Sequence, residues 1–292
     1  MPAEAAGARP VGFIGLGNMG VPMVANLVRA GHPVVAFDVS ADARDRAVAV
    51  GARVVPTAHR VAEAADTVIL MLPNSTIVTD VVHGLAGALS DRSRLVDMSS
   101  SEPLRTRELA EELAPAGVRL VDAPVSGGVA GAEAGRLTIM AGGDPADLAA
   151  VEPVLEALGR VVRVGPVGAG HAVKALNNLL SATHLWITAE AMTVGERFGL
   201  DPAVMLEVFN GSSGRSGSTE TKYPRYILPG SFDSGFGLRL MLKDMQIATR
   251  LAEQVGAPSV LGEHAVERWD SAAQALDPSA DHTRIAAWVA EG

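Results

Sequence analysis

A glycine-rich stretch near the N-terminus has the residue types and the spacing to hold phosphate groups. It follows an apolar run at 11–14 and precedes a helical pattern at 19–30. In such a turn the first glycine permits the tight bend, the second lets a pyrophosphate approach the backbone, and the third lets the helix pack closely. The N-terminus of the helix supplies N–H groups and a positive dipole. The residues predicted to bind the phosphates of a dinucleotide are Gly15, Leu16, Gly17, Asn18, Met19 and Gly20.

An acidic residue stands where it could bind the adenosine ribose. The next apolar run, 34–37, ends in Asp38, whose carboxylate can accept hydrogen bonds from ribose hydroxyls. A carboxylate repels the 2′-phosphate of NADP, so Asp38 favours NAD. NADP stays possible, because Arg44 and Arg46 lie nearby in the sequence. A glycine-rich turn can also bind nothing, but the strand, turn, helix and acidic residue occur here in order, which favours a cofactor site.

Three further polar stretches follow strand patterns. Ser126-Gly127-Gly128 comes after a strand pattern at 120–123, and its hydroxyl and two unshielded N–H groups would suit a carboxylate. On these residues alone, a flexible turn between strands is the favoured alternative. The stretches 72–74 and 99–101 also stand at strand ends, where ligands bind in parallel sheets. For the serines at 99–101, simple capping of the following helix is an equal alternative.

The second half of the chain offers two lysines that could transfer protons or bind anions. Lys174 and Asn178 are four residues apart on a predicted helix, so they share a face. A lone lysine on a helix is more often a solvated surface charge than a catalytic base. The adjacent pair Lys243-Asp244 is likewise more often solvated, and we interpret His171 as a structural residue.

Alternating strand and helix patterns would place the first set of residues at one edge of a sheet. The pattern continues to 165 and includes a fully apolar run at 67–72, as expected of a central strand covered on both faces. Such alternation predicts a doubly wound parallel sheet. The predicted fold is therefore an α/β Rossmann domain followed by an all-α C-terminal domain. The expected boundaries are a disordered tail at 1–10, the Rossmann domain at 11–165 and the helical domain at 166–292.

The helical domain is expected to begin with one long helix at 169–198, which joins the two domains. Glycine and proline residues punctuate the rest, and the stretches 210–217 and 218–223 are polar and expected to be loops. The remaining predicted helices span 202–210, 238–255, 260–276 and 283–289.

Composition excludes several classes of protein. The chain has 292 residues, 48% of them hydrophobic, and a net charge of −9 with no cluster of Lys and Arg, so we expect no nucleic-acid partner. No apolar run reaches the roughly 18 residues that a membrane span needs, and the N-terminus lacks the pattern of a secretory signal. There is no cysteine, and the seven histidines lack metal-ligand spacing, so we expect no metal. A cytoplasmic location is the expectation for a cysteine-free chain without a signal.

Taken together, the motifs resemble the β-hydroxyacid dehydrogenase family, which includes the 3-hydroxyisobutyrate dehydrogenases. The resemblance extends over 11–289, and its motifs occur in the family's order. They are Gly-Leu-Gly-Asn-Met-Gly at 15–20, Leu-Pro-Asn at 72–74, Asp-Met-Ser-Ser-Ser at 97–101, Asp-Ala-Pro-Val-Ser-Gly-Gly at 122–128, Gly-x-Gly-x-x-x-Lys-x-x-Asn-Asn at 168–178 and Lys-Asp at 243–244.

The resemblance implies a role for each matching residue. Lys174 would be the general acid/base, and Asn178 would help to hold the substrate. Lys243 would reach both cofactor and substrate, with Asp244 as its structural partner. The matches to the loop that binds the substrate carboxylate are Ser126, Gly127 and Gly128, and those to cofactor contacts are Leu72, Pro73, Asn74 and Ser100. The family also implies a small carboxylate-bearing substrate, and a homodimer or homotetramer that pairs through the helical half.

The implied reaction transfers a hydride from the alcohol carbon to the nicotinamide, while Lys174 accepts the hydroxyl proton. One departure from the family's pattern concerns the pocket wall, because Gly217 stands where a tryptophan is usual in 3-hydroxyisobutyrate dehydrogenases. The neighbouring polar stretch 218–223 could meet a more polar substrate. Alternatives are a reductase of tartronate semialdehyde or a related compound that uses NADPH, and a dinucleotide-binding module without catalysis.

Overall fold

The computed structural model describes residues 9–292. These residues form two compact units that divide between Lys174 and Ala175, which we call the N-terminal and C-terminal units. Of the predicted tail at 1–10, residues 1–8 lie outside the described residues. The next residue, Arg9, forms an ion pair with the Asp66 carboxylate at 2.8 Å.

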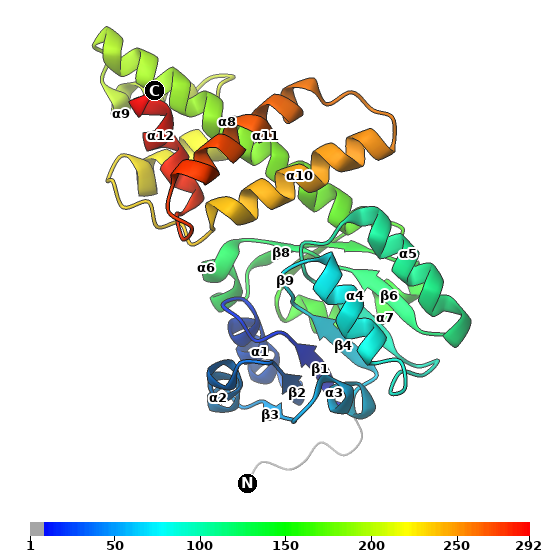
Figure 1. Ribbon diagram of the computed structural model, residues 1–292. Coiled ribbons are helices and arrows are strands. Elements are labelled where there is room, and N and C mark those ends of the chain that lie inside the picture. Colours follow the sequence, from blue (N-terminus) through cyan, green and yellow to red (C-terminus); the bar gives the residue numbers. More distant parts are fainter. Residues whose placement is uncertain (1–8) are drawn as a thin grey trace. The chain divides into compact units, whose positions relative to one another are not determined.

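The N-terminal unit is built on a sheet with the strand order β3-β2-β1-β4-β5-β6-β8-β7, with β9 paired to β8. From β3 to β6 all neighbouring strands are parallel, and helices cover both faces of the sheet (Figure 1). This order confirms the predicted Rossmann-type domain. The strands are β1 Val11–Ile14, β2 Val34–Phe37, β3 Arg53–Val54, β4 Thr67–Leu70, β5 Arg94–Asp97, β6 Arg119–Asp122, β7 Val125–Ser126, β8 Leu137–Gly142 and β9 Gly159–Gly165.

The sheet is parallel as predicted except at one edge. Strand β8 runs antiparallel to both β6 and β7, and β9 then runs parallel to β8. A parallel connection needs a long crossover that carries the chain back along the sheet. Here the chain between β6 and β8 forms the two-residue strand β7 and the six-residue helix α6, Gly128–Glu133, so it returns antiparallel instead.

Two apolar layers hold this sheet, one on each face. Side chains alternate between the faces along a strand, so Phe13 packs in one layer and Ile14 in the other. Ile69 and Leu70 divide in the same way on β4. The helices that cover the layers are α1 Gly20–Arg29, α2 Ala41–Ala49, α3 Ala58–Ala64, α4 Ser75–Gly84, α5 Pro103–Leu113 and α7 Pro145–Glu156, with a short 3₁₀ turn at Ala114–Ala116.

The C-terminal unit is helical over 175–292, all of which is described, and this agrees with the predicted all-α domain. Helix α8, Ala169–Phe198, begins in the N-terminal unit and continues into this one. The hydrophobic core of the C-terminal unit packs around Trp269, Met245 and Leu185. The other helices are α9 Pro202–Asn210, α10 Leu238–Gln254, α11 Val260–Ala275, a 3₁₀ turn at His282–Arg284 and α12 Ile285–Glu291.

The expectation of a loop at 218–223 was wrong. These residues form the first part of a π-helix, η2, Ser218–Ile227. Its polar composition hid the helix in the sequence, yet the side chains of Ser218, Thr219 and Tyr223 are buried. The π-helix is rare, and where π-turns occur they often lie at functional sites.

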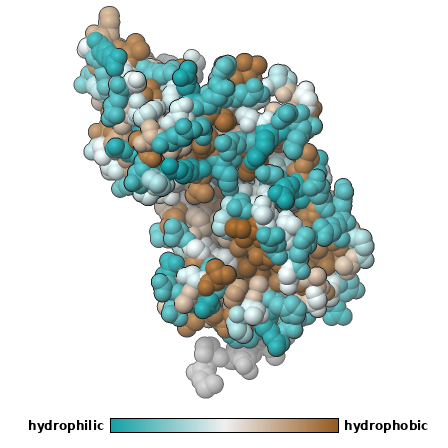
Figure 2. All heavy atoms as spheres, in the orientation of Figure 1, coloured by the Kyte–Doolittle hydropathy of each residue, from teal (hydrophilic) through white to brown (hydrophobic). Residues whose placement is uncertain are grey.

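Across residues 9–292, no helix is both long and apolar enough to cross a bilayer. Figure 2 shows hydrophilic side chains over most of the face that it draws, with hydrophobic ones interspersed.

Candidate functional site

The glycine turn after β1 has the shape that its sequence predicts. Gly15 has a φ of 102°, and a Cβ there would lie 2.2 Å from the Met71 carbonyl oxygen. A Cβ at Gly20 would lie 2.1 Å from the carbonyl oxygen of Gly15, so α1 can approach the turn only without a side chain. A Cβ at Gly17 would meet nothing within 4 Å. The backbone at Gly17 is therefore open on the side where a phosphate would approach.

Asp38 is tied directly to this turn. One carboxylate oxygen, Oδ2, accepts a hydrogen bond from the Leu16 N–H at 2.6 Å, and Oδ1 accepts one from the Ser40 N–H at 2.7 Å. Each oxygen keeps further lone pairs that could accept from ribose hydroxyls. Arg44 also reaches back, and its Nη1 donates to the Asp38 carbonyl at 2.7 Å. Its position on the first turn of α2 places a cation beside Asp38, although the arginine does not follow Asp38 in sequence.

The polar residues after β4 and β5 fasten the two strand ends to each other. The Leu72 N–H donates to Ser99 Oγ at 2.9 Å, and the Glu102 N–H donates to Ser75 Oγ at 2.7 Å. Asn74 Oδ1 accepts from the Ile77 N–H and so caps α4. The Ser99 hydroxyl binds the Leu72 N–H and not the start of α5, so the alternative of simple capping is wrong for Ser99.

The stretch Ser126-Gly127-Gly128 is a junction between a strand and a helix, not a turn between strands. Ser126 pairs with Thr138 in the ladder of β7 and β8, and α6 begins at Gly128. Both glycines have positive φ, 131° and 61°. A Cβ at Gly128 would meet nothing within 4 Å, which leaves that backbone open to a small anion.

The start of α8 is fixed to the sheet by a residue that the sequence argument did not single out as an anchor. The fully buried Asp122, at the end of β6, accepts hydrogen bonds from the backbone N–H groups of Gly168 at 2.7 Å and of His171 at 2.8 Å. Burial raises the pKa of Asp122, while the nearby His171 opposes that shift. His171 is itself buried, and its Nδ1 lies 2.9 Å from Thr106 Oγ1.

Lys174 follows His171 by three residues on α8, and only 8% of its surface is exposed. The alternative of a solvated surface lysine is therefore wrong. A side chain of this length is seldom buried unless it has a partner or a function. The anchored helix start sets the position of this lysine relative to the strand ends of the N-terminal unit.

A second group of predicted residues meets in the C-terminal unit. Asn178 Nδ2 donates to Asp244 Oδ2 at 2.6 Å, and both side chains are buried. The other oxygen of Asp244 lies 3.3 Å from Lys243 Nζ. The pair Lys243-Asp244 is thus no solvated helix pair, since Asp244 is 2% exposed. The Asp244 carboxylate thus accepts a hydrogen bond from the Asn178 amide and forms an ion pair with the Lys243 ammonium.

One contact made by α8 was not expected. Lys222, on η2, donates from Nζ to Ser181 Oγ at 2.7 Å. Burial lowers the pKa of Lys222 to about 8, and the more distant Asp281 carboxylate acts in the opposite direction. The polar character of 218–223 was the only sequence signal for this lysine.

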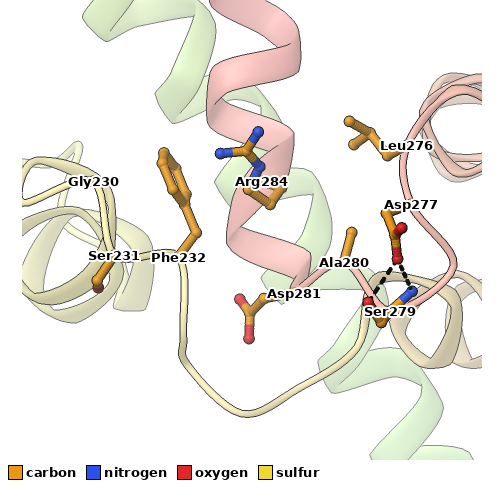
Figure 3. Close-up of a pocket in the computed structure, with 9 residues that line it drawn as sticks. All are labelled: Gly230, Ser231, Phe232, Leu276, Asp277, Ser279, Ala280, Asp281 and Arg284. Atoms are coloured by element: carbon orange, nitrogen blue, oxygen red, sulfur yellow. Dashed lines mark hydrogen bonds between the residues drawn. The ribbon is translucent and has the colours of Figure 1, made fainter.

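The C-terminal unit also has a shallow pocket of about 340 Å³, with no predicted site residue among its lining residues (Figure 3). Arg284 lies over the Phe232 ring, 4.7 Å from its centre, and Asp277 accepts hydrogen bonds from Ser279. The lining residues are Gly230, Ser231, Phe232, Leu276, Asp277, Ser279, Ala280, Asp281 and Arg284. Within residues 9–292, no cluster of three or more His, Asp or Glu side chains could hold a metal ion.

Two family models match the chain. Residues 10–168 match the NAD binding domain of 6-phosphogluconate dehydrogenase, and 168–289 match the NAD-binding domain of NADP-dependent 3-hydroxyisobutyrate dehydrogenase. Together these matches extend from the glycine turn to the last helix.

Similar proteins agree with the family models. The mitochondrial 3-hydroxyisobutyrate dehydrogenase of Bos taurus is 42% identical over 88% of this chain and 79% of its own. The 2-(hydroxymethyl)glutarate dehydrogenase of Eubacterium barkeri is 42% identical over 85% of this chain and 84% of its own. Among solved structures, 3-hydroxyisobutyrate dehydrogenase of Mycobacterium tuberculosis with L-serine is 34% identical, with a TM-score of 0.91 over 97% of this chain and 99% of its own.

Proposed function

The chain belongs to the β-hydroxyacid dehydrogenase family, and from that premise we propose that it interconverts a small 3-hydroxy acid and the corresponding semialdehyde with NAD. The enzyme class, an NAD(P)-dependent 3-hydroxy acid dehydrogenase, follows from the relatives. The roles of individual residues and the preference for NAD are our proposals.

The observation that carries the mechanism is the burial of Lys174 on an anchored helix, one turn before Asn178. Burial disfavours the charged form of an amine, so a buried lysine can accept a proton near neutral pH. In the oxidation of the alcohol, Lys174 Nζ would take the hydroxyl proton, and Asn178 would orient the same oxygen. In the reverse reaction the lysine would return that proton to the carbonyl oxygen.

The nicotinamide dinucleotide supplies the hydride acceptor when it is bound. The open backbone at Gly17 fits a pyrophosphate, and Asp38 at the end of β2 fits the ribose hydroxyls. Other proposed cofactor contacts are Leu72, Pro73, Asn74, Ser100 and Lys243. We propose NAD over NADP, because the Asp38 carboxylate would repel a 2′-phosphate. Asp38→Ser should then raise the efficiency with NADP relative to NAD.

We propose Ser126, Gly127 and Gly128 as the residues that bind the substrate carboxylate, and Lys243 as a further substrate contact. The junction offers a hydroxyl and open backbone N–H groups at two positive-φ glycines. Accordingly, we propose that 11–165 binds the cofactor and that 166–292 completes the substrate site.

The test is nicotinamide absorbance with purified protein, NAD and NADP in parallel, over 3-hydroxyisobutyrate, 3-hydroxypropionate, glycerate, serine and threonate, with semialdehydes in the reverse direction. We expect turnover with NAD and its loss in Lys174→Ala, while that variant still binds NADH. A folded protein that binds NADH but oxidises none of these acids would contradict the proposal and favour a binding module. Turnover only of semialdehydes with NADPH would favour the reductase alternative.

We also propose that the chain forms a homodimer or homotetramer through its helical half. Leu180, Ile187 and Val194 recur every seven residues along α8, and all three are exposed. Such a row is the pattern by which one helix packs on another, and a second copy would cover it. Light scattering should give an oligomer for the wild type and a smaller species for Ile187→Glu. Cytoplasmic location remains a prediction, because the bovine relative is a mitochondrial enzyme.

A further inference from the structure

Lysine is rare in this chain. Only three of its 24 basic residues are lysines, at 174, 222 and 243, and the other 21 are arginines. Surface cations in this protein are therefore arginines. Lysine differs from arginine in its compact ammonium and in the ease with which burial changes its protonation. Two of the lysines belong to the site proposed above, so the third, Lys222, needs an explanation of its own.

Lys222 meets α8 on the same face as Lys174 and Asn178. Its Nζ donates to Ser181 Oγ at 2.7 Å and lies 3.4 Å from the Ser181 carbonyl oxygen. Ser181 comes three residues after Asn178, which places it on that face about 4.5 Å further along the helix axis. A polar row thus runs along α8, with Lys222 at its far end. Beyond Ser181 the row stops, since Leu185 and Met192 continue the same face with apolar, buried side chains.

The ammonium of Lys222 has no carboxylate partner among the residues that the structure describes. Its contacts there are the two oxygens of Ser181. The Asp281 carboxylate, which acts on Lys222 from a distance, already accepts hydrogen bonds from the side chains of Ser234 and Thr283 and from backbone N–H groups. An ammonium has three donors, so one donor of Lys222 remains for a ligand. An incompletely compensated, half-buried cation is costly, and a bound anion would reduce that cost.

The residue that precedes η2 has no side chain. Gly217 caps η2 and precedes Lys222 by five residues, the spacing that brings positions onto successive turns of a π-helix. A Cβ at Gly217 would meet nothing within 4 Å. The exposed start of the helix that carries Lys222 is therefore open where a side chain would otherwise stand.

We propose that Lys222, together with Ser181, binds a second carboxylate on the substrate, so that the enzyme prefers 3-hydroxy acids with a distal carboxylate over those with an alkyl group. The reacting carbon would lie at Lys174 and Asn178, and the distal arm would extend along α8 to Ser181. One ammonium and one hydroxyl suit a carboxylate, whereas phosphate sites usually gather more donors. This inference rests on the proposed function.

Two acids with the same reacting centre test the proposal. 3-Hydroxyisobutyrate carries a methyl group where 2-(hydroxymethyl)glutarate carries a carboxyethyl group. Lys222→Met should lower kcat/KM for the diacid by about 10- to 100-fold, mainly through KM, and change the value for the monoacid by less than about threefold. Ser181→Ala should show a smaller loss in the same direction, and Lys222→Arg should keep part of the preference. The matched control is Arg215→Met, which removes an exposed cation, paired with Glu220, from the segment just before η2.

Equal losses for both acids in Lys222→Met and Ser181→Ala would overturn the proposal and leave the Lys222–Ser181 bond as a purely structural tie. The wild type gives a second readout that does not depend on a variant that folds. Glutarate should inhibit oxidation of the monoacid more strongly than butyrate, and equal inhibition would overturn the proposal.

Failure of the proposed function would look different, because then neither acid would be oxidised. In that case calorimetry with the NADH-bound protein still decides the inference. Glutarate that binds the wild type more tightly than Ser181→Ala supports the distal site, and equal binding contradicts it.

Discussion

The carboxylate of Asp122 accepts a hydrogen bond from the backbone N–H of His171 at 2.8 Å, and this contact joins the end of β6 to the start of α8. The other oxygen of Asp122 accepts from the Gly168 N–H. A helix start has N–H groups without partners in the helix, and here a buried carboxylate satisfies two of them. The helix that carries Lys174 therefore has a fixed origin in the sheet.

Replacing Asp122 with asparagine should weaken the attachment of the start of α8 to the sheet. The amide keeps one acceptor oxygen, so one of the two buried N–H groups loses its partner, at a cost of about 1–3 kcal/mol in the free energy of unfolding. We expect kcat to fall as well, because the position of Lys174 depends on the start of α8. Urea unfolding and initial rates measure the two effects.

A helix cap elsewhere in the same unit is the control for Asp122→Asn. Asp144 caps α7 from an exposed position, where Oδ1 accepts from the Ala146 N–H. Asp144→Ala should cost about 0.5–2 kcal/mol of stability with kcat unchanged. An Asp122→Asn enzyme with wild-type kcat would contradict a role for Asp122 in positioning Lys174.

Asp244 should act on catalysis through Asn178. Asp244→Ala leaves the buried amide of Asn178 without its acceptor, and we expect kcat/KM for the hydroxy acid to fall by about 10- to 100-fold. The variant Asp244→Ala/Asn178→Ala should then be little worse than Asn178→Ala, which a double-mutant cycle measures. Fully additive losses would show that Asp244 acts independently. Asp270→Ala, which removes an exposed partner of Gln274 on α11, is the matched control.

Alanine substitutions at two glycines of the same turn should affect different properties, NADH affinity at Gly17 and stability at Gly20. A Cβ at Gly17 meets nothing within 4 Å, so the free energy of unfolding of Gly17→Ala should lie within about 0.5 kcal/mol of the wild-type value. Its affinity for NADH should nevertheless fall by about tenfold or more, because the Cβ would stand where the pyrophosphate approaches. A Cβ at Gly20 would meet the Gly15 carbonyl oxygen, so Gly20→Ala should lose about 1–3 kcal/mol of stability. Urea unfolding and NADH fluorescence separate the two. Unchanged NADH affinity in Gly17→Ala would contradict the phosphate site.

The strongest sequence signals were those in which a local rule fixes a residue type. Ser40 and Thr57 are of residue types that favour N-caps, and both cap their helices with side-chain oxygens that accept from the N–H groups of Ala43 and Arg60. The long helix begins at Ala169 and ends at Phe198, where Gly199 follows with positive φ. These features depend on a few neighbouring residues, so the sequence is enough to predict them.

The features that were missed depend on residues far apart in the chain. The antiparallel edge at β8 rests on a two-residue strand too short to show a pattern. The contacts of Asp122 with α8 and of Lys222 with Ser181 join segments more than 40 residues apart, and a single aspartate or lysine in the sequence does not show its partner. The π-helix was hidden because buried Ser218 and Thr219 make it look like a polar loop.

His282 should make the stability of the C-terminal unit depend on pH. Burial lowers the pKa of this histidine to about 4, Lys222 acts in the same direction, and Asp281 and the Phe236 carbonyl oppose them. The folded protein therefore binds a proton at His282 less readily than the unfolded chain, in which a histidine titrates near about 6.5. Its contribution to stability is complete above about pH 6.5 and is lost as the pH falls from there toward about 4.

A histidine substitution isolates this contribution from that of other titrating groups. Nδ1 of His282 lies 3.1 Å from the Phe236 carbonyl oxygen, and an asparagine amide could donate there without titrating. The fall in Tm between about pH 7 and about pH 5 should be smaller in His282→Asn than in the wild type. His264→Asn, at an exposed position on α11, should show the wild-type fall. Equal falls in the wild type and His282→Asn would mean that this histidine does not remain neutral in the folded protein as the pH decreases.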